Sequence, residues 1–345
     1  MKALIATGKG NAEFVDVPKP EPNERQILAK VRYAGICATD IAIITDNTSF
    51  VEKGLIEYPV RLGHEWSGVV TEVGSKVTNL KPGDHVVSET GAYCYECPEC
   101  LSGGVCRNAR AVGTVGHHWP GCFAEYMLMP APGVYKISDG LDMKNAALFE
   151  PATIAMKGIQ ALSLQPGDTV LVIGTGPIGL TGVGILKAMG MRVIVSGRRD
   201  GKLEYAKKMG ADLTVNINKT LLKQFLLAHT ERGYVNAIVE TSGSPDVVNE
   251  CATLIKYGRA VMLGFLEKKL DGFDLDSFVL SGNSIMSPIG GPGALKKVIK
   301  LAEQESVDFS PLVTGVYPFA QALKAIEKVI ENGDGRIKIL LDFGE

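Results

Sequence analysis

The stretch TVLVIGTGPIGLTGVG, residues 169–184, joins an apolar run to a glycine-rich turn that opens a helical pattern. Its three glycines have the spacing G-x-G-x-x-G, which indicates a dinucleotide-binding turn when it lies between a strand and a helix. The first glycine permits the tight turn, the second lets the backbone approach a pyrophosphate, and the third allows close helix packing. A flavodoxin-like sheet that binds no dinucleotide is the alternative. We expect the dinucleotide to contact Gly174, Gly176, Pro177, Ile178 and Gly179.

Strand patterns and helical patterns alternate on the C-terminal side of this stretch. The next strand pattern is RVIVSG, residues 192–197, and further ones follow at 212–217, 235–241, 259–265 and 284–290. Apolar strands that alternate with helices are typical of a parallel sheet covered on both faces. We therefore predict a Rossmann-type, doubly wound parallel sheet in this part of the chain.

The N-terminal part of the chain has a different pattern. Short Val- and Ile-rich runs such as SGVVTEVG and HVVSE are separated by Gly, Pro and Asp turns, which predicts a β-rich domain. After GGPG at 290–293, two helical patterns and the strand pattern IKILLDF end the chain. We predict an α/β chain with a β-rich domain at 1–152, the Rossmann domain at 153–291 and a C-terminal return at 292–345.

The segment VIVSGRRDGK, residues 193–202, lies where NAD-binding folds place an acid against the ribose hydroxyls. That acid is absent, and Asp200 comes about three residues late, where we expect it to cap the next helix. Guanidinium groups suit a 2′-phosphate, although a solvated basic loop is the alternative. We favour NADP(H) over NAD(H), bound with the help of Ser196, Arg198, Arg199 and Lys202.

Four of the seven cysteines lie within thirteen residues, in the pattern C-x2-C-x2-C-x5-C. In a reducing compartment such clusters are more often metal ligands than disulfides, and an odd total argues against complete pairing. Four thiolates around one tetrahedral Zn²⁺ leave no open position, so this site is expected to be structural. A nucleic-acid-binding zinc ribbon is the alternative, but the flanks lack a basic surround. The expected ligands are Cys94, Cys97, Cys100 and Cys106.

A second set of candidate ligands is dispersed along the chain in the motifs GICATD, GHEWSG and FEPAT. Each motif alone is a weak signal, because a single Cys or His more often packs in a core. Together they offer a thiolate, an imidazole and a carboxylate, which suffice for a three-ligand catalytic zinc with an open position. The residues concerned are Cys37, Thr39, Asp40, His64, Glu65 and Glu150.

With these motifs, and with KPGDHV, GCFAEY and the closing GRIKILLDF, the chain resembles zinc-dependent medium-chain alcohol/polyol dehydrogenases over essentially its whole length. The resemblance implies a GroES-like catalytic domain, formed by the N-terminal part and the C-terminal tail, with the Rossmann domain inserted between them. It also implies a homodimer or homotetramer. One departure is the cysteine cluster, in which five residues separate the third and fourth cysteines where the family usually has seven.

The resemblance assigns a role to each dispersed residue. Catalytic zinc would be held by Cys37, His64 and Glu150, with Glu65 beside the metal as an alternative ligand. Asp40 would orient His64, and Thr39 would hydrogen-bond the substrate hydroxyl and pass its proton outward. Zinc would lower the pKa of the hydroxyl, and hydride would then pass to the nicotinamide.

Glu150 as third ligand resembles the branch that contains sorbitol, galactitol-phosphate and cyclitol dehydrogenases. The expected substrate is therefore the secondary hydroxyl, or ketone, of a small polyol, cyclitol or sugar. A simple secondary-alcohol or threonine-type dehydrogenase is the alternative, and a non-catalytic NADPH-binding sensor is another. In GHHWPG, the residues His117, His118 and Trp119 either contact a polyhydroxylated substrate or form an exposed turn.

Bulk properties exclude several other classes of protein. The net charge of −2 over 345 residues gives no reason to expect nucleic acid or an anionic membrane as partner. The start MKALIATGKG lacks the apolar core of a signal peptide, and no apolar run is long enough to span a bilayer. We expect a cytoplasmic enzyme.

Overall fold

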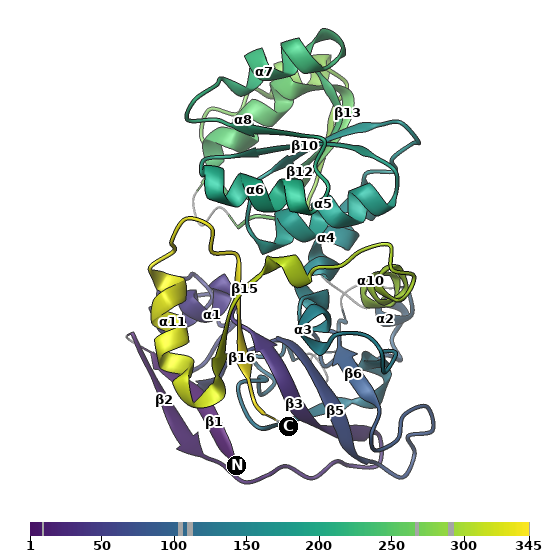
Figure 1. Ribbon diagram of the computed structural model, residues 1–345, viewed down its shortest axis with the longest axis vertical. Coiled ribbons are helices and arrows are strands. Elements are labelled where there is room, and N and C mark those ends of the chain that lie inside the picture. Colours follow the sequence, from purple (N-terminus) through teal and green to yellow (C-terminus); the bar gives the residue numbers. More distant parts are fainter. Residues whose placement is uncertain (9, 103–105, 109–112, 266–268, 289–292, 345) are drawn as a thin grey trace. The chain divides into compact units, whose positions relative to one another are not determined.

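The computed structural model describes residues 1–344 except residues 9, 103–105, 109–112, 266–268 and 289–292 (Figure 1). The chain divides into two compact units. The first comprises the chain before Pro151, the segment from Gly293 to the end of helix α10 (Ala294–Glu303), and the chain from Val313 onward. The second comprises the described residues from Pro151 to Pro288 and from Gln304 to Leu312. The predicted boundary at residue 291 lies outside the described residues.

A six-stranded parallel sheet forms the centre of the second unit (Figure 1). Its strand order is β11-β10-β9-β12-β13-β14, in which the order reverses at β9. The strands are β9 (Thr169–Ile173), β10 (Arg192–Gly197), β11 (Leu213–Asn216), β12 (Val235–Glu240), β13 (Ile255–Met262) and β14 (Ser284–Met286). This is the order of a Rossmann sheet, in which ligands bind where the strand order reverses. The predicted fold class is confirmed.

Six helices accompany this sheet among the described residues. They are α4 (Phe149–Ala161), α5 (Pro177–Ala188), α6 (Asp200–Lys208), α7 (Leu222–His229), α8 (Pro245–Leu254) and α9 (Leu275–Leu280). Strand β9 is buried from its second residue to its last, as expected for a central strand covered on both faces. Residues 304–312 also belong to this unit, because Val307 and Phe309 pack beside Gly184 of α5.

The first unit contains two sheets. The larger has the order β15-β16-β3-β5-β6-β8, with β7 paired to β3, and the smaller has the order β2-β1-β4. The larger sheet consists of β3 (Gln26–Gly35), β5 (Glu65–Val73), β6 (His85–Ser88), β7 (Tyr126–Pro130), β8 (Val134–Lys136), β15 (Val313–Pro318) and β16 (Lys338–Asp342). The smaller consists of β1 (Lys2–Gly8), β2 (Asn11–Asp16) and β4 (Val60–Arg61).

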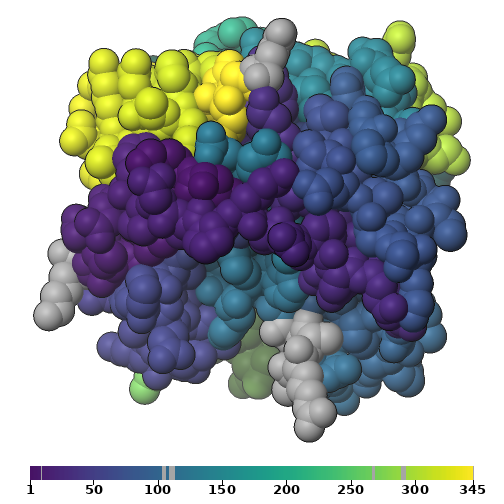
Figure 2. Space-filling view, turned by 90° about the horizontal axis from the view of Figure 1, so that it is seen from below, coloured from purple at the N-terminus to yellow at the C-terminus, as the bar shows by residue number. Residues whose placement is uncertain are grey.

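Two ends of the chain meet in this unit. Antiparallel pairing joins β16 to β3, with Leu340 opposite Gly35, and Gly35 is in turn opposite Glu65 of β5. Figure 2 shows N-terminal residues (purple) beside C-terminal residues (yellow) on one face. The helices of the unit are α1 (Ala38–Ile44), α2 (Pro98–Leu101), α3 (Met143–Ala146), α10 and α11 (Ala322–Ile330). The strand pairing therefore brings the ends of β3, β5 and β16 together.

Candidate metal centres and dinucleotide site

Cys37, His64 and Glu65 come together at this junction of strands. Cys37 follows β3 and is the N-cap residue of α1, while His64 and Glu65 lie at the start of β5. One ligand atom from each residue lies within 4.8 Å of the other two. A thiolate, an imidazole and a carboxylate at this separation are a donor set that zinc accepts. We call these three residues the dispersed centre.

Asp40 ties the two segments of the dispersed centre to each other. Its Oδ2 accepts a hydrogen bond from the Cys37 N–H at 2.8 Å, and its Oδ1 accepts one from the Gly63 N–H at 3.0 Å. Oδ1 lies 3.8 Å from His64 Nδ1, beyond hydrogen-bond distance. Asp40 is fully buried, so it holds the backbone on both sides of the centre from within the core.

The His64 side chain lies among negatively charged groups. Burial opposes the charged imidazole, but Cys37, Asp40 and Glu150 raise the pKa of His64 well above its ordinary value. Its buried Nδ1 has no hydrogen-bond partner among the described residues. An anionic surround with an orphaned ring nitrogen fits a divalent cation at this position.

Lys338 is a member of this site that the sequence did not reveal. Its Nζ lies 2.8 and 2.7 Å from the two carboxylate oxygens of Glu65, and it donates to the Ile36 carbonyl at 3.1 Å. Both side chains are nearly inaccessible, at 2% and 1% exposure. A Cβ on Gly35 would lie 2.2 Å from Glu65 Oε2, so this glycine makes room for the ion pair. The available signal was a single Lys within the apolar run IKILLDF.

Glu150 and Thr39 lie beside the dispersed centre in different ways. Glu150, in the first turn of α4, accepts a hydrogen bond from Thr90 Oγ1, and its carboxylate is outside the three-atom group. Burial raises the pKa of Glu150, while the charge on His64 opposes that shift. Cys37 Sγ donates to Thr39 Oγ1 at 3.7 Å, so the Thr39 hydroxyl lies next to the thiol ligand.

The loop before β7 places its three candidate residues in three different environments. His118 is exposed, and Trp119 Nε1 donates to the Leu128 carbonyl at 2.8 Å. The His117 ring lies edge-on to the His64 ring, with 6.3 Å between centroids. Burial, together with the charges of His64 and His118, lowers the pKa of His117 to about 4. Of the three, only His117 adjoins the dispersed centre.

Cys94, Cys97, Cys100 and Cys106 form a compact group of free thiols, which we call the four-cysteine cluster. Their sulfur–sulfur distances include 3.5 Å (94–106), 3.9 Å (94–100) and 4.0 Å (97–106). Four sulfurs at about 2.3 Å from one tetrahedral Zn²⁺ lie about 3.8 Å apart, so the cluster fits the ion. Residues 103–105 of the shortened spacer lie outside the described residues.

The backbone of the cluster favours a thiolate at Cys94. Hydrogen bonds from the N–H groups of Glu96 and Cys97 lower the pKa of Cys94 to about 6. The Cys100 N–H donates to Cys97 Sγ at 3.5 Å, where Cys97 is the N-cap residue of α2. Both contacts lie within one short turn, so the sequence spacing itself produces them.

The glycine-rich turn has the geometry expected for a dinucleotide. Gly174 has φ of +107°, and a Cβ there would lie 2.5 Å from Thr241 Oγ1. A Cβ on Gly179 would lie 2.3 Å from the Gly174 carbonyl, so the helix packs tightly on the turn. Gly176 caps α5, and no other atom lies within 4 Å of its would-be Cβ among the described residues. The space in front of the α5 N-terminus is therefore open to a pyrophosphate.

The end of β10 carries the residues expected to determine whether NADP(H) or NAD(H) is preferred. Ser196 Oγ is buried without a partner among the described residues, and Arg198 is exposed. The expectation that Asp200 caps the next helix is wrong, because Arg199 is the N-cap residue of α6. Asp200 instead accepts from Asn216 Nδ2 at 2.8 Å and pairs with Lys219 Nζ at 2.6 Å. The Asp200 carboxylate, which directly follows Arg198 and Arg199 in the sequence, is thus engaged with a cation.

Comparison with known proteins decides the family. A model of the alcohol dehydrogenase GroES-like domain matches residues 23–139, and a model of zinc-binding dehydrogenases matches residues 177–304. The L-threonine 3-dehydrogenase of Bacillus subtilis (strain 168) is 32% identical over 99% of this chain and 98% of its own. The chain belongs to the zinc-dependent medium-chain alcohol/polyol dehydrogenase family. It is accordingly a zinc-dependent, NAD(P)-linked dehydrogenase, as the resemblance predicted.

Other members of this family are similar over their whole length. The D-arabitol-phosphate dehydrogenase of Enterococcus avium is 32% identical over 98% of this chain and 95% of its own. A zinc-binding dehydrogenase of Sinorhizobium meliloti 1021 bound to NADP has a TM-score of 0.88 and 27% identity, covering 99% and 98% of the two chains. An alcohol dehydrogenase of Escherichia coli CFT073 complexed with NADH has a TM-score of 0.91 and 28% identity, covering 99% of each chain.

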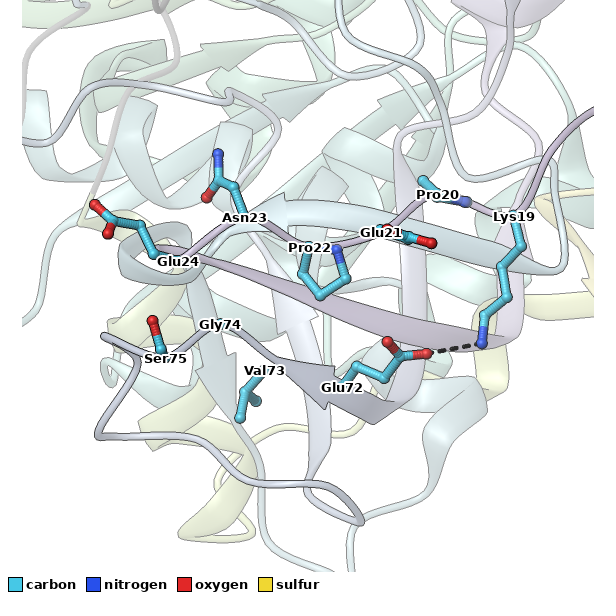
Figure 3. A pocket seen from close by; sticks show the side chains of 10 residues that line it. All are labelled: Lys19, Pro20, Glu21, Pro22, Asn23, Glu24, Glu72, Val73, Gly74 and Ser75. Carbon is cyan, nitrogen blue, oxygen red and sulfur yellow. Dashed lines mark hydrogen bonds and ion pairs between the residues drawn. The ribbon is translucent and has the colours of Figure 1, made fainter.

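One further cavity, of about 570 Å³, lies on the first unit (Figure 3). It is lined by Lys19–Glu24 and by Glu72–Ser75, and its cation Lys19 pairs with Glu72 at 2.8 Å. Glu24 pairs with Lys76 at 2.7 Å. Its lining contains no Cys or His that could bind a metal, so the cavity carries no functional assignment.

In the described part of the chain, no helix has the length and apolar character needed to cross a membrane.

Proposed function

We propose that this dehydrogenase transfers hydride between NADP(H) and a secondary hydroxyl or ketone of a small polyol, cyclitol or sugar. The observation that carries the proposal is the convergence of Cys37, His64 and Glu65 within 4.8 Å. These residues, with Glu150 as a further carboxylate, would hold the catalytic zinc. Zinc in such a site supplies Lewis-acid chemistry, which lowers the pKa of an alcohol or polarises a carbonyl.

The side chains of the site would then have separate tasks. Thr39, beside Cys37, would accept the hydroxyl proton and pass it toward solvent. Asp40 would keep Cys37 and His64 in register through its two backbone hydrogen bonds. Lys338 would hold Glu65 as a charged neighbour of the metal, available as an alternative ligand. The four-cysteine cluster would bind a second, structural zinc and take no part in chemistry.

The preference for NADP(H) rests on the end of β10. A carboxylate there would repel a 2′-phosphate, and the nearest acid, Asp200, is paired with Lys219. Arg198, Arg199, Lys202 and the Ser196 hydroxyl would contact the 2′-phosphate and its ribose. One similar structure is bound to NADP and another to NADH, so the relatives do not decide the cofactor. The preference for NADP(H) is therefore argued from the residues of this loop alone.

Threonine-type oxidation is the second candidate, because a threonine dehydrogenase is among the relatives at 32% identity. The test is the initial rate of nicotinamide reduction with polyols, cyclitols, L-threonine and simple secondary alcohols, each with NADP⁺ and NAD⁺. Turnover of a polyol with NADP⁺ preferred is the expected result. A preference for L-threonine would replace the substrate assignment, and a preference for NAD⁺ would overturn the assignment of Arg198 and Arg199.

Two further expectations accompany this proposal. The cytoplasmic location expected from the sequence stays a prediction, and so does the homodimeric or homotetrameric state that the family resemblance implies. Sedimentation of the purified protein measures the second directly, and a monomer at micromolar concentration would contradict it.

A further inference from the structure

His117 carries a buried ring nitrogen without a hydrogen-bond partner. Its Nε2 is inaccessible to solvent, and the described part of the chain offers it no donor or acceptor. The ring lies 6.3 Å from the His64 ring at an interplanar angle of 73°, and 5.8 Å from the Phe50 ring at 57°. An orphaned polar atom therefore lies beside a residue of the dispersed centre, with an aromatic ring next to it.

The loop that carries His117 is firmly positioned. The His117 N–H donates to the Thr114 carbonyl at 3.0 Å, and the Gly116 N–H donates to the Trp119 carbonyl at 2.9 Å. Gly116 has φ of +79°, and a Cβ there would lie 3.0 to 3.2 Å from the backbone of Gly63. Only glycine fits that close approach, which seats the loop against the residue that precedes His64. The position of the His117 backbone is thus fixed by the turn around it.

A buried polar atom without a partner costs free energy, so its presence beside the dispersed centre requires an explanation. An imidazole nitrogen can donate to or accept from a hydroxyl group. We propose that the His117 ring turns when an alcohol binds at the dispersed centre, that its Nε2 then hydrogen-bonds a substrate hydroxyl adjacent to the reacting carbon, and that this contact selects polyhydroxylated substrates over simple alcohols. The inference rests on the proposed function, because it needs an alcohol bound at the dispersed centre.

The test compares diols with the matching monoalcohols, namely 2,3-butanediol with 2-butanol and 1,2-cyclohexanediol with cyclohexanol. His117→Phe removes the nitrogen and keeps an aromatic ring, while His118→Phe is the matched control at the exposed neighbour. Loss of the contact is expected to lower kcat/KM for the diols roughly 10- to 100-fold, mainly through KM, and to change monoalcohol rates less than about 3-fold. His118→Phe is expected to leave both substrate classes unchanged, and His117→Asn to restore part of the diol rate.

Each other outcome has a definite meaning. Equal losses for diols and monoalcohols, or no loss for either, would overturn the assignment of His117 while leaving the enzyme class intact. A changed absorption spectrum of the cobalt-substituted His117→Phe protein would show a role at the metal and would also overturn it. Absence of any alcohol turnover by the wild-type enzyme would defeat the proposed function, and the role of His117 with it.

Discussion

The four-cysteine cluster takes its ligands from thirteen consecutive residues, whereas the dispersed centre takes its residues from the ends of two strands and a counter-ion from a third. In the cluster, a short turn and its backbone N–H groups gather four identical donors. In the dispersed centre, β3, β5 and β16 must pair before a thiol, an imidazole and a carboxylate meet. A complete set of four thiolates closes the first site to substrate, while the mixed donor set of the second suits an open, reactive metal.

The largest expected effect comes from Cys37, the only thiol of the dispersed centre. Cys37→Ala removes the thiol that we propose as a zinc ligand, so turnover should fall roughly 10,000-fold. NADPH binding, measured by fluorescence titration, should survive because the glycine-rich turn expected to bind the dinucleotide lies in the second unit. The matched control is Cys251→Ala, which removes a buried thiol of α8 and should keep most of the activity. Unchanged turnover in Cys37→Ala would mean that the dispersed centre is not catalytic.

Lys338 tests how far the dispersed centre depends on its counter-ion. Lys338→Met leaves the Glu65 carboxylate buried without its partner, and breaking such a pair costs about 3 to 5 kcal/mol of unfolding free energy. Urea denaturation of the wild-type and variant proteins measures this loss. The double variant Lys338→Met/Glu65→Gln should recover part of it, since the uncompensated charge is gone. A single variant as stable as the wild type would contradict the buried pair.

The four-cysteine cluster should respond in stability rather than in chemistry. Cys100→Ala is expected to remove one equivalent of zinc and lower the unfolding free energy by about 2 to 3 kcal/mol. The protein that remains folded should keep its KM values, because no substrate reaches this site. Metal analysis and thermal unfolding measure the effect, again with Cys251→Ala as the control for loss of a buried thiol. A selective loss of kcat at unchanged stability would show that the cluster takes part in catalysis and would contradict its structural role.

The smallest effect concerns the choice between the two carboxylates. Because Lys338 engages both oxygens of Glu65, we expect Glu150 to contribute more than Glu65 to metal binding. Glu150→Gln should therefore weaken zinc binding roughly 10- to 100-fold, and Glu65→Gln should weaken it less. Competition with a chelator measures both affinities. The reverse order would make Glu65 the third ligand.

The same contrast explains what the sequence alone could predict. The glycine-rich turn and the four-cysteine cluster could be predicted from the sequence, because the residues that form each of them lie only a few positions apart. The ion pair of Lys338 could not be predicted, because its partner Glu65 is 273 residues distant in the sequence. A single Lys in an apolar strand does not by itself indicate an ion pair. The role of Asp200 was mispredicted for a related reason, since its partner Asn216 ends β11 and its partner Lys219 follows that strand.

The His117 loop shows the limit most clearly. Two adjacent histidines look equivalent in GHHWPG, yet one is exposed and the other faces His64. Their difference arises from the close packing of Gly116 on Gly63, a contact across more than fifty residues. Contacts of this kind depend on which strands pair, and no single sequence motif predicts that pairing.

The most direct test of the two-centre account follows zinc content and turnover together while dipicolinate removes the metal. The account predicts that the first equivalent of zinc leaves with the activity while circular dichroism stays unchanged. The second equivalent should stay bound until the protein unfolds. Activity that survives the loss of the first equivalent, or loss of both equivalents at once with the fold, would contradict it.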